Sequence, residues 1–262
     1  DLYLKNSSIE LWILPIPEDP AGTNAIGAIQ FGGIATQSGS VNFQIAGQLV
    51  RIVIQKDWTP VEIVAALDAV IAQRPDLPTT SVAAGNQVDL TSRWKGESGN
   101  DIDLRLQENS TPPPGITVTF VDMAGGAGDP LIDTALSNLG SQQYNTVALG
   151  YNDIDNIEFL NTVLLERWGP LLAPEGQGFF ASRGSYADLL TLGGMLNSQV
   201  LTFCGPGKIP QPSWEMAAAT AGLDATRIEI DTMASREDLQ AVGIDAPLPS
   251  DAFEVNELNV PT

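Results

Sequence analysis

Residues 145–222 have the sequence NTVALGYNDIDNIEFLNTVLLERWGPLLAPEGQGFFASRGSYADLLTLGGMLNSQVLTFCGPGKIPQPSWEMAAATAG, and their pattern is the most informative about the fold. Three short apolar runs, at 146–149, 178–181 and 200–204, are each followed by a longer segment. The short runs are typical of strands buried on both faces, and the longer segments are typical of helices with one apolar face. Because alternating strands and helices usually form parallel sheets, the stretch predicts an α/β domain of three layers around a parallel sheet.

Start and stop signals support two of the helices. Asp153 is among the cap candidates that precede the first helix, and Gly169-Pro170 is expected to end it. Ser185 stands three residues before Asp188, which is the spacing of a capping box. The boundaries of these helices are therefore predicted by local residues alone.

An apolar run at residues 9–14 predicts one further strand. It ends at Pro15, which cannot donate a hydrogen bond to a ladder, and we expect it to belong to the same sheet. Loop-forming residues follow at 17–24. Helical periodicity returns only at 130–139, with Asp129 as the expected cap.

Residues 25–122 have a different pattern from the rest of the chain. Apolar and polar residues alternate at 41–45 and 50–55, which predicts two strands joined by a turn at 46–48. One helix, capped by Thr59, interrupts the strands. Further strands are expected at 79–84, 86–92, 101–107 and 115–122.

The sequence thus predicts an α/β core that carries an inserted β-rich (α+β) domain. Residues 1–24 supply the first strand of the core, residues 25–122 form the insertion, and residues 123–262 supply the remainder of the core with an extended tail. The glycine-rich residues 123–128 predict a flexible junction. We expect a last short strand at 227–230, followed by a tail that becomes ordered only against a neighbouring molecule.

The composition excludes several classes of function. With 32 acidic and 12 basic residues the formal charge is −20, which repels phosphate backbones and anionic lipids, so nucleic acid and membranes are excluded as partners. The sequence contains no histidine, which excludes His-dependent catalytic triads, His-ligated zinc and imidazole bases. No apolar stretch has the length of a membrane span, and residues 1–30 carry no secretion signal.

The strongest candidate for chemistry is a pair of carboxylates, Asp101 and Asp103. On a strand they would share one face, where they could bind a divalent ion or act as an acid and base. Arg105 falls on the same face and would neutralise them, which makes a solvated surface the expected outcome.

The remaining candidates also favour structural roles. The glycines at 125–128 could hold a phosphate, but Asp129 is expected to occupy the helix start, and a hinge is favoured. Residues 204–208 resemble half of a P-loop and lack its other residues. Cys204, the single cysteine, is expected to be a buried thiol. Ser182 and Ser185 are expected to cap a helix or lie in a turn rather than act as nucleophiles. We therefore expect no catalytic, cofactor-binding or metal site, no cofactor and no enzyme.

A series of sequence motifs is distributed along nearly the whole chain. They are QLVRIVI at 48–54, WKGESGNDIDLR at 94–105, MAGGAG at 123–128, YND at 151–153, ERWGP at 166–170, ASRGS at 181–185, NS at 197–198 and PSWE at 212–215. In this order they resemble the contractile-phage tail sheath proteins of the Mu-like kind. Each motif alone has little specificity, and their shared order makes the resemblance specific.

The resemblance implies a structural protein of the virion that is assembled in the host cytoplasm. Such subunits stack as hexameric rings around a tail tube and stay extended until the baseplate lets them contract, which drives the tube through the host envelope. No nucleotide is consumed. Family members also add strands to neighbouring subunits through extended arms.

The chain departs from the family pattern at both ends. It begins without methionine inside the first half of the family, and residues 253–259 stop short of the C-terminal domain, so we expect a fragment without the arms. We accordingly expect the chain by itself to be monomeric. The alternatives left open are a sheath of a bacteriocin or secretion-type machine, a glycan-binding or adhesive module built on residues 25–122, and an enzyme that uses Asp101 and Asp103.

Overall fold

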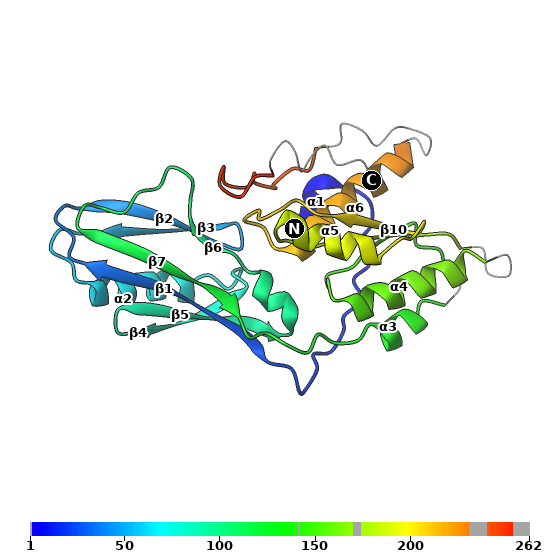
Figure 1. The fold of residues 1–262 in the computed structure, drawn as a ribbon, viewed down its shortest axis with the longest axis horizontal. Helices are drawn as coiled ribbons and strands as arrows, with labels where there is room; N and C mark the ends of the chain where they lie inside the picture. Colours follow the sequence, from blue (N-terminus) through cyan, green and yellow to red (C-terminus); the bar gives the residue numbers. More distant parts are fainter. Residues whose placement is uncertain (1, 141, 170–173, 231–239, 254–262) are drawn as a thin grey trace. The chain divides into compact units, whose positions relative to one another are not determined.

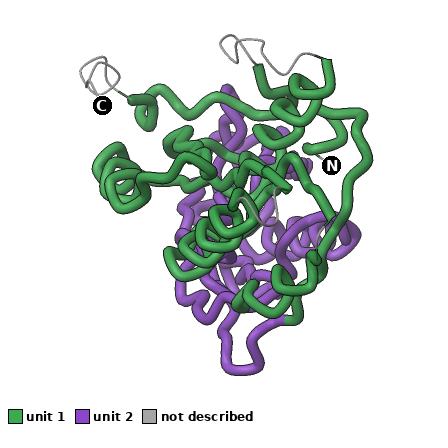
Figure 2. The backbone as a smooth tube through the Cα atoms, turned by 90° about the vertical axis from the view of Figure 1, so that its right-hand side faces the viewer, with its two compact units in different colours: residues 1–17, 130–262 green, residues 18–129 purple. Residues whose placement is uncertain are grey.

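The chain forms two compact units, as the computed structural model shows (Figure 2). Unit 1 consists of residues 1–17 and 130–262, and unit 2 consists of residues 18–129. The structure describes residues 2–140, 142–169, 174–230 and 240–253. Unit 2 is longer than the predicted insertion, 25–122, because the segments on both sides of it hydrogen-bond to unit 2 itself.

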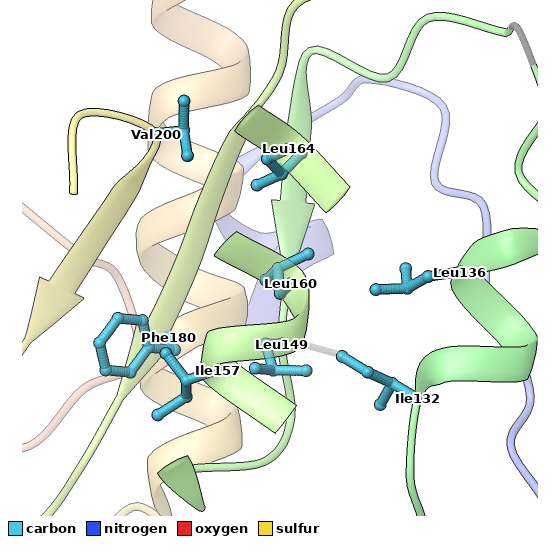
Figure 3. Close-up of a cluster of buried hydrophobic side chains, with 8 residues drawn as sticks. All are labelled: Ile132, Leu136, Leu149, Ile157, Leu160, Leu164, Phe180 and Val200. Carbon is cyan, nitrogen blue, oxygen red and sulfur yellow. The ribbon is translucent and has the colours of Figure 1, made fainter. Parts of the chain in front are cut away.

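Unit 1 is an α/β unit, as the sequence predicts. Its three strands are parallel in the order β10-β9-β8, with β8 at Thr146–Ala148, β9 at Gln177–Ala181 and β10 at Leu201–Cys204. Helix α4, Ile154–Arg167, follows β8, helix α5, Tyr186–Met195, follows β9, and helix α6, Ser213–Ile230, follows β10. In Figure 3, α4 lies in front of the strands and α6 behind them.

The apolar face of α4 forms the centre of the unit 1 core. The helix begins at Asp153, whose carboxylate accepts a hydrogen bond from the Asn156 amide at 3.0 Å, as the predicted cap requires. Its buried residues meet Phe180 of β9 and Val200, which precedes β10 (Figure 3). Full burial of each large apolar side chain stabilises the fold by about 1.5–3 kcal/mol.

Three predicted elements of unit 1 differ in the structure. Residues 9–14 form no strand, and the N-terminal element is instead helix α1, Leu2–Asn6, which packs against α6. Helix α3 is short, Asp133–Ser137, rather than 130–139. Residues 227–230 are the end of α6 and not a strand, because the packing of α1 along α6 extends the helix; the Thr226 hydroxyl donates to the Asn6 carbonyl at 3.2 Å.

The segment 240–253 hydrogen-bonds to unit 1, and residues 231–239, which also belong to the predicted tail, lie outside the described part of the chain. The Asn6 side chain donates to the Val242 carbonyl at 3.0 Å and accepts from the Val242 amide at 2.7 Å. The Gln211 side chain accepts from the Asp245 amide at 3.0 Å. Buried side-chain amides therefore give this segment the backbone partners that a strand or helix would otherwise supply. Residues 254–262 lie outside the described part of the chain.

Unit 2 contains two antiparallel sheets and one long helix (Figure 1). The first sheet has the order β4-β5-β1-β7 and the second β3-β2-β6. The bounds are β1 Asn24–Gly33, β2 Gly39–Ile45, β3 Gln48–Ile54, α2 Pro60–Ala72, β4 Thr79–Ala84, β5 Gln87–Lys95, the short 3-10 helix η1 Glu97–Asp101, β6 Leu104–Leu106 and β7 Ile116–Ala124.

The local signals of unit 2 are found where the sequence predicts them. The hairpin between β2 and β3 turns at Ala46 and Gly47, both with positive φ, which is typical of a two-residue hairpin loop. The capping box of α2 is present, with the Thr59 amide donating to the Glu62 carboxylate at 2.8 Å, and this bond lowers the pKa of Glu62. The two sheets meet through the ring of Phe43, which contacts Phe31 and Phe120 edge-on.

We expect the boundaries of unit 2 to decide its stability when it is produced alone. Residues 18–129 should unfold cooperatively in urea, with Trp58 and Trp94 fluorescence as the signal. Residues 25–122 should be less stable by about 2–4 kcal/mol, because this shorter piece lacks hydrogen bonds to Thr23, Gly126 and Asp129. Equal midpoints for the two fragments would show that the junction contributes nothing to unit 2.

Candidate functional site

The acidic pair predicted from the sequence does not form a site. Asp101 ends η1 and Asp103 lies outside any strand, so the expectation that both lie on one strand face is wrong. Asp103 instead receives two hydrogen bonds from the buried guanidinium of Arg105, from Nε and, at 2.9 Å, from Nη2. Arg105 therefore neutralises Asp103. Across the described ranges, no three Asp, Glu or Cys side chains gather closely enough to hold a metal ion.

Asp129 does not cap a helix, which corrects a second expectation. Helix α3 begins at Asp133 with Ile132 in the cap position. The Asp129 carboxylate is used within unit 2, where it accepts from the Ser98 amide at 3.3 Å and from the Ser98 hydroxyl at 3.4 Å. Because Ser98 lies in η1, this contact joins the end of unit 2 to its interior.

We define the junction clamp as residues 22–24, 95–100 and 124–129, the place where the chain enters and leaves unit 2. The Thr23 carbonyl accepts from the Gly96 amide at 3.0 Å and from the Ala127 amide at 3.2 Å. The Thr23 amide donates to the Ala127 carbonyl at 2.9 Å, and its hydroxyl donates to the Gly125 carbonyl at 2.8 Å. The entering and leaving segments are thereby bonded to each other and to η1.

Asn100 completes the junction clamp from inside unit 2. Its side-chain amide donates to the Gly126 carbonyl at 2.9 Å, and its side-chain oxygen accepts from the Gly126 amide, also at 2.9 Å. Gly126 is buried, so water cannot replace these two bonds without opening the clamp. The glycines predicted to be a hinge are thus held on both sides by hydrogen bonds.

The glycines of the clamp are required by close approach. A Cβ on Gly126 would overlap the Gly96 carbonyl oxygen. Gly96 has φ +123°, a conformation that other residues rarely adopt, and a Cβ there would overlap the Asp129 carboxylate. The motifs WKGESGND and MAGGAG therefore carry small residues because two backbone segments and a turn meet at this point.

The other candidates also have structural roles. Ser185 and Asp188 form the predicted capping box of α5, and the Ser185 hydroxyl lowers the pKa of Asp188. The Ser182 hydroxyl bonds to the neighbouring Arg183 carbonyl at 3.4 Å. Cys204 is half-buried rather than fully buried, and desolvation raises the pKa of its thiol to about 11. A thiol with that pKa is protonated at neutral pH, which does not favour a nucleophile.

Two buried polar side chains of α4 connect the elements of unit 1. Asn156, 1% exposed, donates to the Pro130 carbonyl at 3.0 Å and accepts from the Ile132 amide at 2.9 Å. Arg167 donates to the Gly140 carbonyl at 2.6 Å and to the Gln142 carbonyl. Residue-by-residue inspection of the sequence missed both roles. The available signal was the spacing of Asn156 four residues before Leu160, which places an amide on the apolar face of the helix.

These contacts hold backbone segments in place and do not assemble reactive groups. The buried polar side chains described above all bond to main-chain atoms or to a charged neighbour. Within the described residues, no helix has both the length and the apolar character needed to cross a membrane. The geometry is that of a scaffold.

Comparison with curated proteins gives a match along nearly the whole chain. No known family profile matches the chain. The Mu-like prophage FluMu tail sheath protein of Haemophilus influenzae is 34% identical to it over 256 residues, which is 97% of this chain and 52% of that relative. The chain therefore spans about half the length of the curated relative it matches.

Substitution of Gly126 by alanine should open the junction clamp. The added Cβ overlaps the Gly96 carbonyl and separates Gly126 from Asn100, so we expect unit 2 to lose at least about 3 kcal/mol of stability in urea unfolding. The matched control is Gly125→Ala, where nothing lies within 4 Å of the added Cβ and only the positive φ is unfavourable. That change should cost about 1–2 kcal/mol. Equal losses for the two variants would mean that close approach at Gly126 does not matter.

Proposed function

We propose that this chain, which is related over nearly its whole length to a Mu-like phage tail sheath protein, is part of the outer sheath of a contractile phage tail. The sequence identity along almost all of the chain is the observation that carries this proposal. A tail sheath relative is a structural protein, and this argues against an enzymatic role. The scaffold geometry of the junction clamp and of the α4 contacts supports the same conclusion.

The motifs that resemble the sheath family have architectural roles in this fold, which supports the proposal. WKGESGND and MAGGAG build the junction clamp, and ERWGP contains Arg167, which holds residues 140 and 142. The Ser198 hydroxyl of the NS motif bonds to the Asn161 side chain at 2.5 Å and to the Val200 amide at 3.2 Å. A sheath subunit transmits force without catalysing a reaction, and rigid connections between its helices and strands would serve this role.

The finer features of the proposal follow the family. Unit 1 would be the sheath core, with helices on both faces of its parallel sheet as the three-layer arrangement requires, and unit 2 would be a domain inserted into it. In the virion the subunits would stack as hexameric rings around a tail tube above a baseplate and contract to drive the tube through the host envelope. They would assemble in the host cytoplasm, with neither nucleic acid nor membrane as a partner.

Antibodies against residues 18–129 should label the tail along its whole length. The measurement is immuno-electron microscopy of particles that contain the full-length protein, in extended and contracted forms. Periodic labelling of the outer wall in both forms is expected, because every sheath subunit carries unit 2. Labelling confined to fibres or to the tip would favour an adhesive module. Labelling of tubes without a capsid would assign the sheath to a bacteriocin or secretion-type machine.

The chain by itself should be monomeric at micromolar concentration. Its formal charge of −20 makes two copies repel each other within a screening distance of about 10 Å at 0.1 M salt. Light scattering over a salt series is the measurement, and any association should appear only as salt rises. A stable hexamer at low salt would contradict the charge argument and leave the sheath proposal intact.

A further inference from the structure

The last segment of the chain that the structure describes, residues 240–253, lies along unit 1, and we call it the strap (Figure 1). Near its start, the side chain of Asn6 in α1 donates to the Val242 carbonyl and accepts from the Val242 amide. Further along, the side chain of Gln211, which precedes α6, accepts from the Asp245 amide at 3.0 Å. Two side-chain amides from different parts of unit 1 therefore hold the first half of the strap.

The end of the strap is held by the ring of Phe253. This ring meets the ring of Tyr186, the first residue of α5, edge-on with 6.0 Å between their centroids. It also lies against the backbone of the loop after β10, because a Cβ on Gly207 would be 3.2 Å from the Phe253 ring. Since α5 follows β9, the ring lies at the carboxyl ends of β9 and β10. In open α/β sheets this edge is the usual place for ligands to bind.

The strap has little that fixes it permanently to unit 1. It contributes no strand or helix, and none of its side chains is buried. Apolar burial therefore adds little to its attachment, in contrast to β9, where Phe180 is 1% exposed. A segment with few apolar contacts and few hydrogen bonds opens at a lower free energy than the core to which it is attached.

The closed position of the strap is nevertheless well defined. Asn6 and Gln211 are only 9% and 4% exposed, so opening leaves two enclosed amides without their backbone partners, and closure is favoured. The strap also passes close to α1 at Gly243, where φ is +88° and a Cβ would be 2.7 Å from the Leu2 side chain. Only glycine fits this conformation without strain.

We propose that residues 240–253 are a releasable strap, which opens and closes while the sheet of unit 1 stays folded. When closed, the strap covers the loop at Gly207 and the start of α5 at Tyr186, and when open it exposes both. Because these residues follow β10 and β9, the strap controls access to the carboxyl edge of the sheet. The inference concerns unit 1 alone and does not depend on the proposed sheath function.

Hydrogen exchange of the unaltered chain, followed at single amides by NMR over a series of low urea concentrations, tests the proposal. The strap amides of Val242, Asp245, Asp251 and Ala252 all have described acceptors. They should exchange at least about tenfold more slowly than in an unstructured peptide, at rates that do not change with urea, because local opening exposes little surface. The Gly178 amide of β9 should exchange at least about a hundredfold more slowly than the strap and should accelerate with urea, because it requires unfolding of the sheet.

Two neighbouring substitutions separate the strap from the core. Gly243→Ala places a Cβ against Leu2 at a positive φ, so the strap amides should approach the peptide rate while Gly178 keeps its own rate. Val242→Ala is the matched control, because this side chain is 60% exposed and its loss should leave exchange at Asp245 and Ala252 unchanged.

Three results would each overturn the proposal. Strap amides that accelerate with urea in parallel with Gly178 would show that the strap opens only when unit 1 unfolds. Strap amides at the peptide rate in the unaltered chain would show that the strap does not close. Faster exchange at Gly178 in Gly243→Ala would show that the strap is not separate from the core.

Discussion

The pairing of residues 22–24 with residues 124–129 is the contact on which the organisation of the chain depends. An inserted unit begins and ends at neighbouring points, so two backbone segments must lie side by side where it starts. Each segment brings amides and carbonyls that lose water there and must find partners. Thr23 supplies partners through its backbone and hydroxyl, and Asn100 supplies them to the buried Gly126. The insertion is consequently closed at its base by its own residues.

Side-chain amides perform the same task elsewhere in the molecule. Asn156 holds the backbone at residues 130 and 132, where the chain returns to unit 1, and Asn6 holds residue 242. An amide can donate and accept at once, so one buried Asn satisfies both groups of a backbone segment that belongs to no sheet. Irregular segments are in this way fixed to the core without a ladder. While these bonds are made, the segments are held rigidly to the elements that carry the amides.

The net negative charge acts between whole molecules, whereas individual ion pairs act between neighbouring residues. The charge of −20 affects how whole molecules approach each other, whereas the ion pairs of Arg74 with Asp76 and of Arg105 with Asp103 are local. Both pairs join residues two positions apart in the chain, so they stiffen turns more than they connect distant elements. Cohesion within each unit comes from apolar burial and from hydrogen bonds to backbone.

Local periodicity and capping signals in the sequence were enough to predict several elements of both units. The alternation of strands and helices in unit 1, the caps at Asp153, Thr59 and Ser185, and the hairpin at residues 46–47 depend on neighbours a few positions apart. Long-range contacts, in contrast, make Asp129 bond to Ser98 instead of capping a helix, and make residues 227–230 continue α6. It also left residues 9–14 outside the sheet that their composition predicts. These outcomes depend on contacts between residues far apart in the chain. There, burial and the available hydrogen-bond partners outweigh the intrinsic secondary-structure propensity of each residue.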